Sequence, residues 1–473
     1  MRPFNNRARK AALALFVMGA LSATSSHNAI AQTPFGEVDR TASAHISFSA
    51  AERGQPVEAG SEVTVSGEGF KAGQEVTLFY GSTPLNSPAL VADAEGKISA
   101  AIAIPASAVS GTHPIVVVAK QPYHAAIAEL KVSPTVPLSG QDNYTITHTE
   151  VTRGLYQAAY SAKNNVLYTT SAVGRPPIRE SEILKLNADT LAVLARGTPA
   201  EVAAPEGEQA GSAGVYGVYG LGLDDTKGTL WVTNTRQNTV AVYDQADLSL
   251  VKQFPAGTVN HARDVVIDEQ LGKAYASAAT TPDIIVFDTT SLEPIGKITI
   301  PALARGSQFS TFSLSFDPAA QRLYTVSMTT NEVAIIDTRT DAVAKVFPVP
   351  GAKSAIGVTH DAQTGRIYVV AQGSDNLIVL DGESGAVIAD TPIGAGALNA
   401  AFDPLNRVVY VASRNAGTIT VADADGKIIA NLGPAPLANH VALGKDGVVY
   451  AVDKSANARE ADNDLIMRIA PRR

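Results

Sequence analysis

The chain has 473 residues, with 38 glycines, 26 prolines and no cysteine. Hydrophobic residues make up 45% and charged residues 17%, a balance that provides large cores and excludes a wholly disordered chain. The lack of cysteine excludes disulfides and thiolate chemistry. A net charge of −8 opposes long-range attraction of nucleic acid or anionic lipid, so an anion site requires a local basic patch.

Residues 1–31 have the pattern of a signal peptide. A basic segment precedes a short apolar stretch at 11–21, and small residues at 29–31 form a cleavage site. We expect cleavage after Ala31, export to the periplasm and no stable membrane anchor in the mature protein, because the apolar stretch is short. Cleavage takes the formal net charge from −8 to −12, since it removes four basic residues and no acid: Arg2, Arg7, Arg9 and Lys10.

Residues 44–134 alternate short apolar-polar runs with turns. Six or seven short strands over this length predict a β-sandwich. The turn Gly-Glu-Gly-Phe-Lys-Ala-Gly at 67–73, followed by a Val-x-Leu strand, resembles bacterial immunoglobulin-like modules, which act as spacers or binding surfaces. His45, His113 and His124 fall on different predicted strands or loops, so we predict no metal site among them.

From residue 143 to the C-terminus, a pattern of four short strands recurs about every forty to fifty residues, the period of propeller blades. An aromatic residue marks the second strand of each repeat, and aspartate usually ends the third. We count seven repeats; the last, ending at 465–469, supplies three strands, and the early strand at 144–149 is expected to complete it and close the ring. The aromatics are Tyr168, Trp231, Tyr275, Tyr324, Tyr368, Tyr410 and Tyr450, and the aspartates are Asp244, Asp288, Asp337, Asp381 and Asp423.

The predicted fold is therefore all-β: an immunoglobulin-like β-sandwich at 44–134 and a seven-bladed β-propeller at 143–473. Val232–Asn234, Tyr368–Val370 and Tyr410–Ser413 resemble the Tyr-Val-Thr-Asn motif of the YVTN propeller family. The region from about Gly154 to Ile469 is most similar to exported YncE-type propellers. That resemblance implies single-stranded DNA as a ligand. The sandwich and a Gly/Glu/Ala-rich insertion at 196–213 lie outside it.

Blade topology predicts where a ligand would bind. The innermost strand of a blade comes first, so the loops into it and the loops between strands two and three open on one face. Cations and aromatic residues occur in both sets of loops. They favour either a rim that stacks bases and neutralises phosphates, or aromatic core packing with ordinary loop cations. The predicted ligand-binding residues are Arg153, Tyr156, Tyr216, Tyr219, Arg236, His261, Arg263, Phe309, Lys353, Arg414, His440 and Lys454.

Three functions follow from this pattern. The first is non-catalytic binding at the channel mouth, with single-stranded nucleic acid as the candidate ligand. The second is a rigid platform for another exported protein. The third is a lactonase-like hydrolase with a divalent metal, for which Glu150, Asn234, Asn260 and Asn399 are candidate ligands, although no aspartate occupies a channel-facing strand start. We predict no catalytic residue, metal or cofactor, and expect the aspartates ending the third strands to cap turns.

Overall fold

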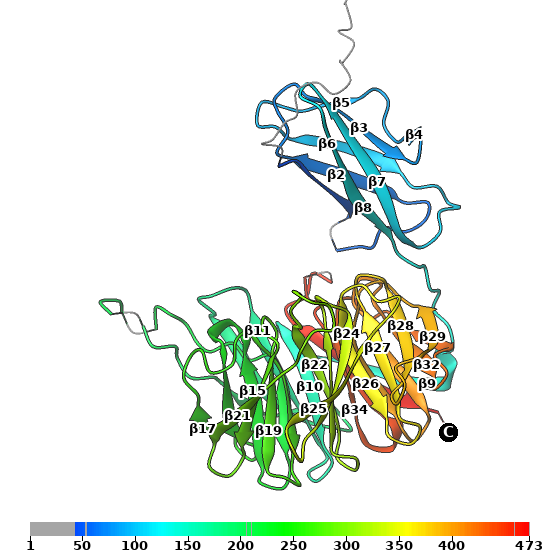
Figure 1. Cartoon of the computed structure of the whole chain (residues 1–473). Helices are drawn as coiled ribbons and strands as arrows, with labels where there is room; N and C mark the ends of the chain where they lie inside the picture. The colour runs from blue at the N-terminus through cyan, green and yellow to red at the C-terminus, as the bar shows by residue number, and fades with distance from the viewer. Residues whose placement is uncertain (1–42, 53, 205, 210, 458, 473) are drawn as a thin grey trace, which may run out of the picture.

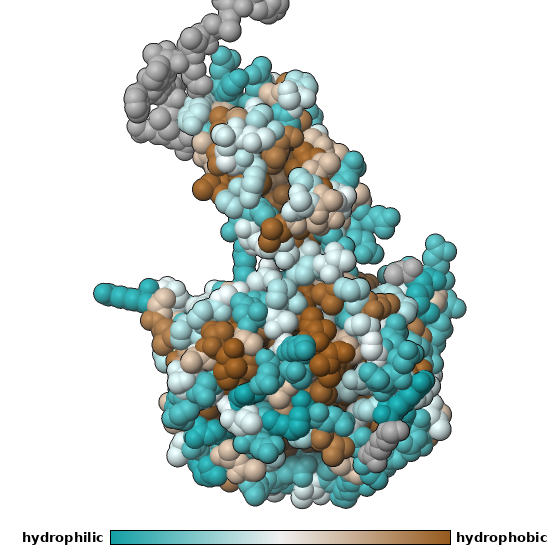
Figure 2. All heavy atoms as spheres, turned by 90° about the vertical axis from the view of Figure 1, so that its right-hand side faces the viewer, coloured by the Kyte–Doolittle hydropathy of each residue, from teal (hydrophilic) through white to brown (hydrophobic). Residues whose placement is uncertain are grey.

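The computed structural model describes residues 43–52, 54–204, 206–209, 211–457 and 459–472. The predicted signal peptide lies outside these residues. The described chain is built from strands with three short 3-10 helices, so the all-β prediction is confirmed. No helix in the described part is long and apolar enough to cross a membrane. Figure 1 shows an N-terminal unit above a larger C-terminal unit, and Figure 2 shows that the two meet at a narrow waist.

The N-terminal unit contains two antiparallel sheets around one core. Three strands form one sheet in the order β1-β2-β6, and β4-β3-β7-β8, with β5 beside β3, form the other. Alternating side chains such as Val63, Val65, Val76 and Leu78 are fully buried between the sheets. The strands are β1 (His45–Ala50), β2 (Glu62–Glu68), β3 (Glu75–Tyr80), β4 (Thr83–Pro84), β5 (Leu90–Val91), β6 (Ile98–Ala103), β7 (Gly111–Lys120) and β8 (His124–Val132).

The C-terminal unit contains seven four-stranded antiparallel sheets within the described residues. Each of the first three sheets uses four consecutive strands. They are β10 (Leu155–Ser161), β11 (Val166–Val173), β12 (Glu180–Asn187) and β13 (Val193–Gly197); β14 (Leu221–Asp224), β15 (Thr229–Asn234), β16 (Thr239–Asp244) and β17 (Leu250–Gln253); β18 (Ala262–Asp268), β19 (Lys273–Ala278), β20 (Asp283–Asp288) and β21 (Glu293–Thr299).

The next three sheets follow the same rule. They are β22 (Thr311–Asp317), β23 (Arg322–Ser327), β24 (Glu332–Asp337) and β25 (Ala342–Pro348); β26 (Ala355–Asp361), β27 (Arg366–Ala371), β28 (Asn376–Asp381) and β29 (Val387–Pro392); β30 (Ala397–Asp403), β31 (Val408–Ser413), β32 (Thr418–Asp423) and β33 (Ile428–Leu432). The short 3-10 helices are η1 (Gln141–Asn143), η2 (Thr235–Gln237) and η3 (Lys445–Gly447).

The seventh sheet joins the two ends of this unit. It combines β34 (Ala438–Leu443), β35 (Val449–Asp453) and β36 (Asp464–Pro471) with the early strand β9 (Tyr144–Thr152). β9 pairs antiparallel with β36, as the sequence predicts. The first strands of successive sheets are neighbours, and β34 neighbours β10, so the sheets form a closed ring consistent with a β-propeller.

The repeated aromatic residues and aspartates have separate structural roles. Tyr168, Trp231, Tyr275, Tyr368 and Tyr410 are fully buried. Some hydroxyls tie one sheet to a turn of the next: Tyr168 donates to the Gln245 carbonyl (2.8 Å), Tyr368 to Ala424 (3.0 Å) and Tyr450 to Ala188 (2.8 Å). The aspartates accept backbone N–H groups in the following turn, as predicted: Asp244 from Ala246, Asp288 from Thr290, Asp337 from Arg339, Asp381 from Glu383 and Asp423 from Asp425.

Candidate functional site

Arg263, on β18, lies in a group of cations and aromatic rings drawn from different sheets. Its guanidinium carbon is 5.2 Å from the ring centroid of Tyr156 on β10 and 5.9 Å from that of Phe312 on β22. The Nζ of Lys454, just after β35, is 4.9 Å from the same Tyr156 ring. Tyr219, just before β14, contacts Tyr156 edge-on at 5.0 Å between centroids. The predicted loop topology thus brings together residues that are distant in sequence.

Electrostatic interactions add Arg414 and His440 to this group. Arg414, between β31 and β32, lowers the pKa values of both Arg263 and Lys454, in each case after the larger effect of burial. Burial, with Arg263, lowers the pKa of His440 to about 3, so this imidazole is neutral at pH 7. The central cluster comprises Tyr156, Tyr219, Arg263, Phe312, Arg414, His440 and Lys454. Solvent reaches Tyr156, Arg263, Arg414 and Lys454, which are partly exposed.

The cations of the central cluster are not held by direct ion pairs in the part of the chain that the structure describes. Among the described residues, neither Arg263, Arg414 nor Lys454 forms an ion pair within 4.0 Å or a side-chain hydrogen bond. The Arg263 Nε and the Tyr219 hydroxyl are buried without a hydrogen-bond partner. Burial raises the pKa of Tyr219, so its hydroxyl remains a donor. Both groups can donate a hydrogen bond.

Two carboxyl groups lie near these cations, and both also accept backbone N–H groups. Asp264, next to Arg263 on β18, is 8% exposed and accepts the N–H of Leu314 at 2.9 Å. Burial raises the pKa of Asp264. Asp464 is 3% exposed and accepts the N–H groups of Gly154 and Leu155 at 2.6 and 3.1 Å. Three cations, Arg263, Arg414 and Lys454, thus face two carboxyl groups, so the cluster keeps a positive excess in a partly desolvated place.

Several predicted residues lie at the edge of the central cluster. Arg236 is exposed on η2, and its charge contributes, after burial, to a lowered pKa of His261. Tyr216 is partly exposed in the segment before β14. Arg153 is exposed between β9 and β10, where its Nη2 donates to Asn457 at 3.4 Å. These residues surround the central cluster without joining its ring contacts.

Two predicted ligand residues have other roles. Phe309 is fully buried in the apolar core between the third and fourth sheets, so its predicted ligand contact is wrong. Lys353 pairs with Glu129 of the N-terminal unit, so it belongs to the interface between units.

The sequence did not predict Asp264, an acid near the start of an inner strand, as a member of this site. The adjacent Arg263 could have indicated this acid, because a cation stabilises the charge of a buried carboxylate beside it.

Three of the four candidate lactonase ligands make other contacts. Glu150 pairs with Arg459 at 2.9 Å, and the Asn234 amide donates to the Gly217 carbonyl at 3.1 Å. The Asn399 side chain accepts the N–H of Val441 at 2.9 Å. Within the described ranges, no group of three or more His, Cys, Asp or Glu residues could hold a metal ion.

Comparisons with known proteins agree with the propeller-like architecture. No family model matches the chain. The uncharacterized protein YncE of Salmonella typhimurium is 24% identical over 337 residues, which are 68% of this chain and 89% of the relative. YncE of Salmonella typhi is 23% identical over the same shares. These relatives support a YncE-like family.

Two solved structures share the fold. A chain of Kuenenia stuttgartiensis hydrazine synthase superposes with a TM-score of 0.53 and 17% identity, covering 66% of this chain and 96% of that one. A chain in the crystal structure of the mitotic checkpoint complex gives a TM-score of 0.53 and 11% identity, covering 72% of this chain and 96% of that one. At these identities the likeness concerns the fold alone.

Proposed function

We propose that this chain is an exported, non-catalytic binding protein in which a seven-bladed β-propeller, preceded by an immunoglobulin-like module, holds an anionic ligand at the channel mouth. The single observation that carries the proposal is the central cluster, where Arg263, Arg414 and Lys454 have no ion-pair partner among the described residues. Unpaired, partly buried cations are costly, so their arrangement points to a ligand that supplies negative charge.

Single-stranded nucleic acid is the polymeric ligand that this proposal names first. Phosphates would contact Arg414 and Lys454, with Arg236 at the edge, and these contacts need no base sequence. Base stacking has less support, because the Tyr156 ring already contacts Arg263, Lys454 and Tyr219. We therefore expect phosphate contacts to dominate the affinity. An acidic segment of another exported protein is the second candidate, since it presents the same charge to the same residues.

A labelled single-stranded oligonucleotide, titrated with mature protein and followed by fluorescence anisotropy, tests the nucleic-acid ligand. We expect saturable binding whose log association constant falls with log salt by about 0.7 per phosphate contacted. Arg236→Gln should reduce that slope by about one contact. Arg339→Gln is the matched control, because Arg339 is exposed in the turn between β24 and β25, on the opposite face. Absence of binding at the lowest salt would exclude the oligonucleotide.

The protonation of Lys454 predicts a pH dependence. Burial, with the charge of Arg414, lowers the pKa of Lys454 to about 8. Below that pH the amine is charged and attracts an anion; above it, the free protein loses the charge. A bound anion raises this pKa, so affinity should fall by up to about tenfold per pH unit above pH 8. Anisotropy titrations between pH 7 and 10 check this, and Lys454→Met should flatten the profile. A flat wild-type profile would contradict the role of Lys454.

A further inference from the structure

The N-terminal unit contacts the same face of the C-terminal unit that carries the central cluster. Its contacts involve Gln372 and Asp375 between β27 and β28, Lys353 before β26, and Asn415 between β31 and β32. These are loops into first strands or between second and third strands, as are the loops that hold Arg414 and Lys454. Figure 1 shows the N-terminal unit above this face, on the side of β28.

Lys131, on β8, makes the most buried of these contacts. Its Nζ donates to the Asp375 carboxylate at 2.9 Å and to the Gln372 carbonyl at 3.0 Å. The Asp375 side chain is 1% exposed, and Lys131 is its one ion-pair partner among the described residues. Removing one partner of such a pair leaves an uncompensated buried charge, which is strongly unfavourable. The buried charge of Asp375 is therefore compensated by a cation from the other unit.

Asp375 also holds the backbone that positions Arg414. The same carboxylate oxygen that accepts Lys131 accepts the N–H of Gly396 at 2.8 Å. The Gly396 carbonyl in turn accepts the N–H of Arg414 at 3.0 Å. The Gly396 loop is closely packed: its φ is 72°, and a Cβ there would collide with the Asn415 side chain. A short chain of hydrogen bonds thus connects Lys131 to a cation of the central cluster.

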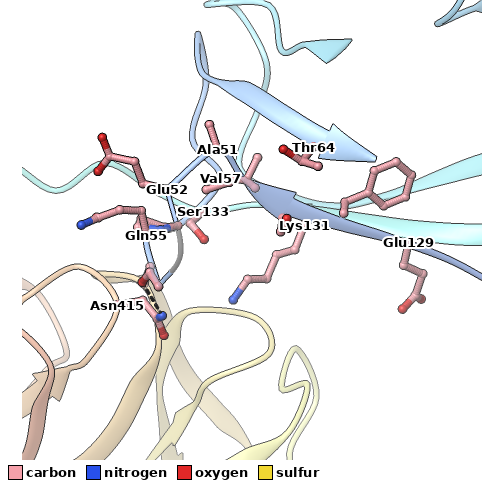
Figure 3. Close-up of a pocket in the computed structure, with 15 residues that line it drawn as sticks. Ala51, Glu52, Gln55, Val57, Thr64, Glu129, Lys131, Ser133 and Asn415 are labelled. Carbon is pink, nitrogen blue, oxygen red and sulfur yellow. Dashed lines mark hydrogen bonds between the residues drawn. The ribbon is translucent and has the colours of Figure 1, made fainter. Parts of the chain in front are cut away.

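Asn415 provides a second connection beside the first. Its side-chain amide donates to the Gly54 carbonyl of the N-terminal unit at 2.9 Å, while its backbone N–H donates to the Ala395 carbonyl at 3.0 Å. A cavity of about 600 Å³ separates the units here, with Lys131 and Asn415 in its lining. Figure 3 shows Lys131 extending from its strand and Asn415 bonded to the opposite unit. Polar contacts of Lys131 and Asn415 thus join the two units beside this cavity.

We propose that Lys131 and Asp375 are positioning residues for the anion site, so that docking of the N-terminal unit holds Arg414 in its ligand-binding place. The inference rests on the proposed function, because it assigns a role to Arg414 in binding. It gives the N-terminal unit a part in recognition beyond that of a spacer. Coupling is reciprocal, so a bound anion also strengthens docking of the unit.

The test uses Lys131→Met in the full mature chain, with the labelled single-stranded oligonucleotide as the probe. We expect affinity to fall by about five- to tenfold, the lower range of coupling between sites. Lys131→Arg, which keeps the positive charge, should keep most of the wild-type affinity. Lys120→Met is the matched control, because Lys120 pairs with Glu75 in the same unit and both side chains are 55% exposed. This control should bind as the wild type does.

Hydrogen exchange gives a readout that needs no ligand. The backbone amides of Gly396 and Arg414 should exchange faster than in the wild type in Lys131→Met. Their exchange rates should be unchanged in Lys120→Met. Unchanged exchange in Lys131→Met overturns the inference, and so does faster exchange with wild-type affinity, because Lys131 would then be only structural. If the wild type binds no oligonucleotide, the proposed ligand fails; the exchange rates then decide by themselves whether Lys131 holds the Arg414 loop.

Discussion

Asp464→Ala is expected to lower the free energy of unfolding of the C-terminal unit by about 3 kcal/mol or more. The Asp464 carboxylate accepts three backbone N–H groups, from Gly154 at 2.6 Å, Leu155 at 3.1 Å and Ala456 at 2.9 Å. Leaving a buried N–H without an acceptor costs about 1–3 kcal/mol, and here one substitution affects all three. The loss is large because these groups belong to opposite ends of the unit, where the ring closes.

Denaturant unfolding followed by fluorescence measures this effect. Trp231 is the single tryptophan of the chain and is fully buried in the second sheet, so its emission reports the C-terminal unit. Asp464→Asn should lower the free energy of unfolding by less, because its amide oxygen still accepts backbone N–H groups. Asp247→Ala is the control, because Asp247 also accepts a turn N–H, that of Ser249, but on the surface. Equal midpoints for Asp464→Ala and wild type would show that closure depends on the β9–β36 ladder alone.

The ring closure was predictable because its signal is periodic. The repeated aromatics and aspartates set the strand order, and the incomplete last repeat called for the strand at 144–149. In the structure Thr149 pairs with Ile466 and Ile146 with Ile469. Local rules suffice here, since each strand needs only an apolar face and a partner of the right length. The role of Asp464 could not be predicted from the sequence, because two of the N–H groups that it accepts come from residues about 310 positions away and meet it only when the ring closes.

The candidate site was predictable in part. Topology places Tyr156, Arg263 and Lys454 near one another, because first strands and second-to-third loops share a face. Phe309 occupies a similar position in its repeat but turns into the core between sheets, a choice made by packing with the neighbouring sheet. The pairing of Lys353 with Glu129 could not be predicted, because Glu129 is 224 residues away, in the other unit. Contacts between units follow from docking geometry, which no local pattern encodes.

The double substitution Arg414→Met with Lys454→Met is expected to reduce oligonucleotide affinity at low salt by at least about a hundredfold, because two charged phosphate contacts are lost. The free energy of unfolding should stay unchanged or rise, by about 1–2 kcal/mol. The reason is that burial lowers the pKa values of both side chains, so keeping them charged in the free protein is unfavourable. Anisotropy and the Trp231 unfolding curve, measured on the same preparation, check both parts.

Arg263→Met provides the contrast that separates binding from stability. Arg263 stabilises the charge of its buried neighbour Asp264, so methionine there leaves that carboxyl without its cation and should lower stability. If the double variant is stabilised and does not bind, the cations are held at a cost in folding, as expected of a ligand site. If the double variant binds like the wild type, the affinity comes from Arg236 and the edge of the cluster. If it unfolds more easily than the wild type, Arg414 and Lys454 contribute to packing, and the anion site loses its main support.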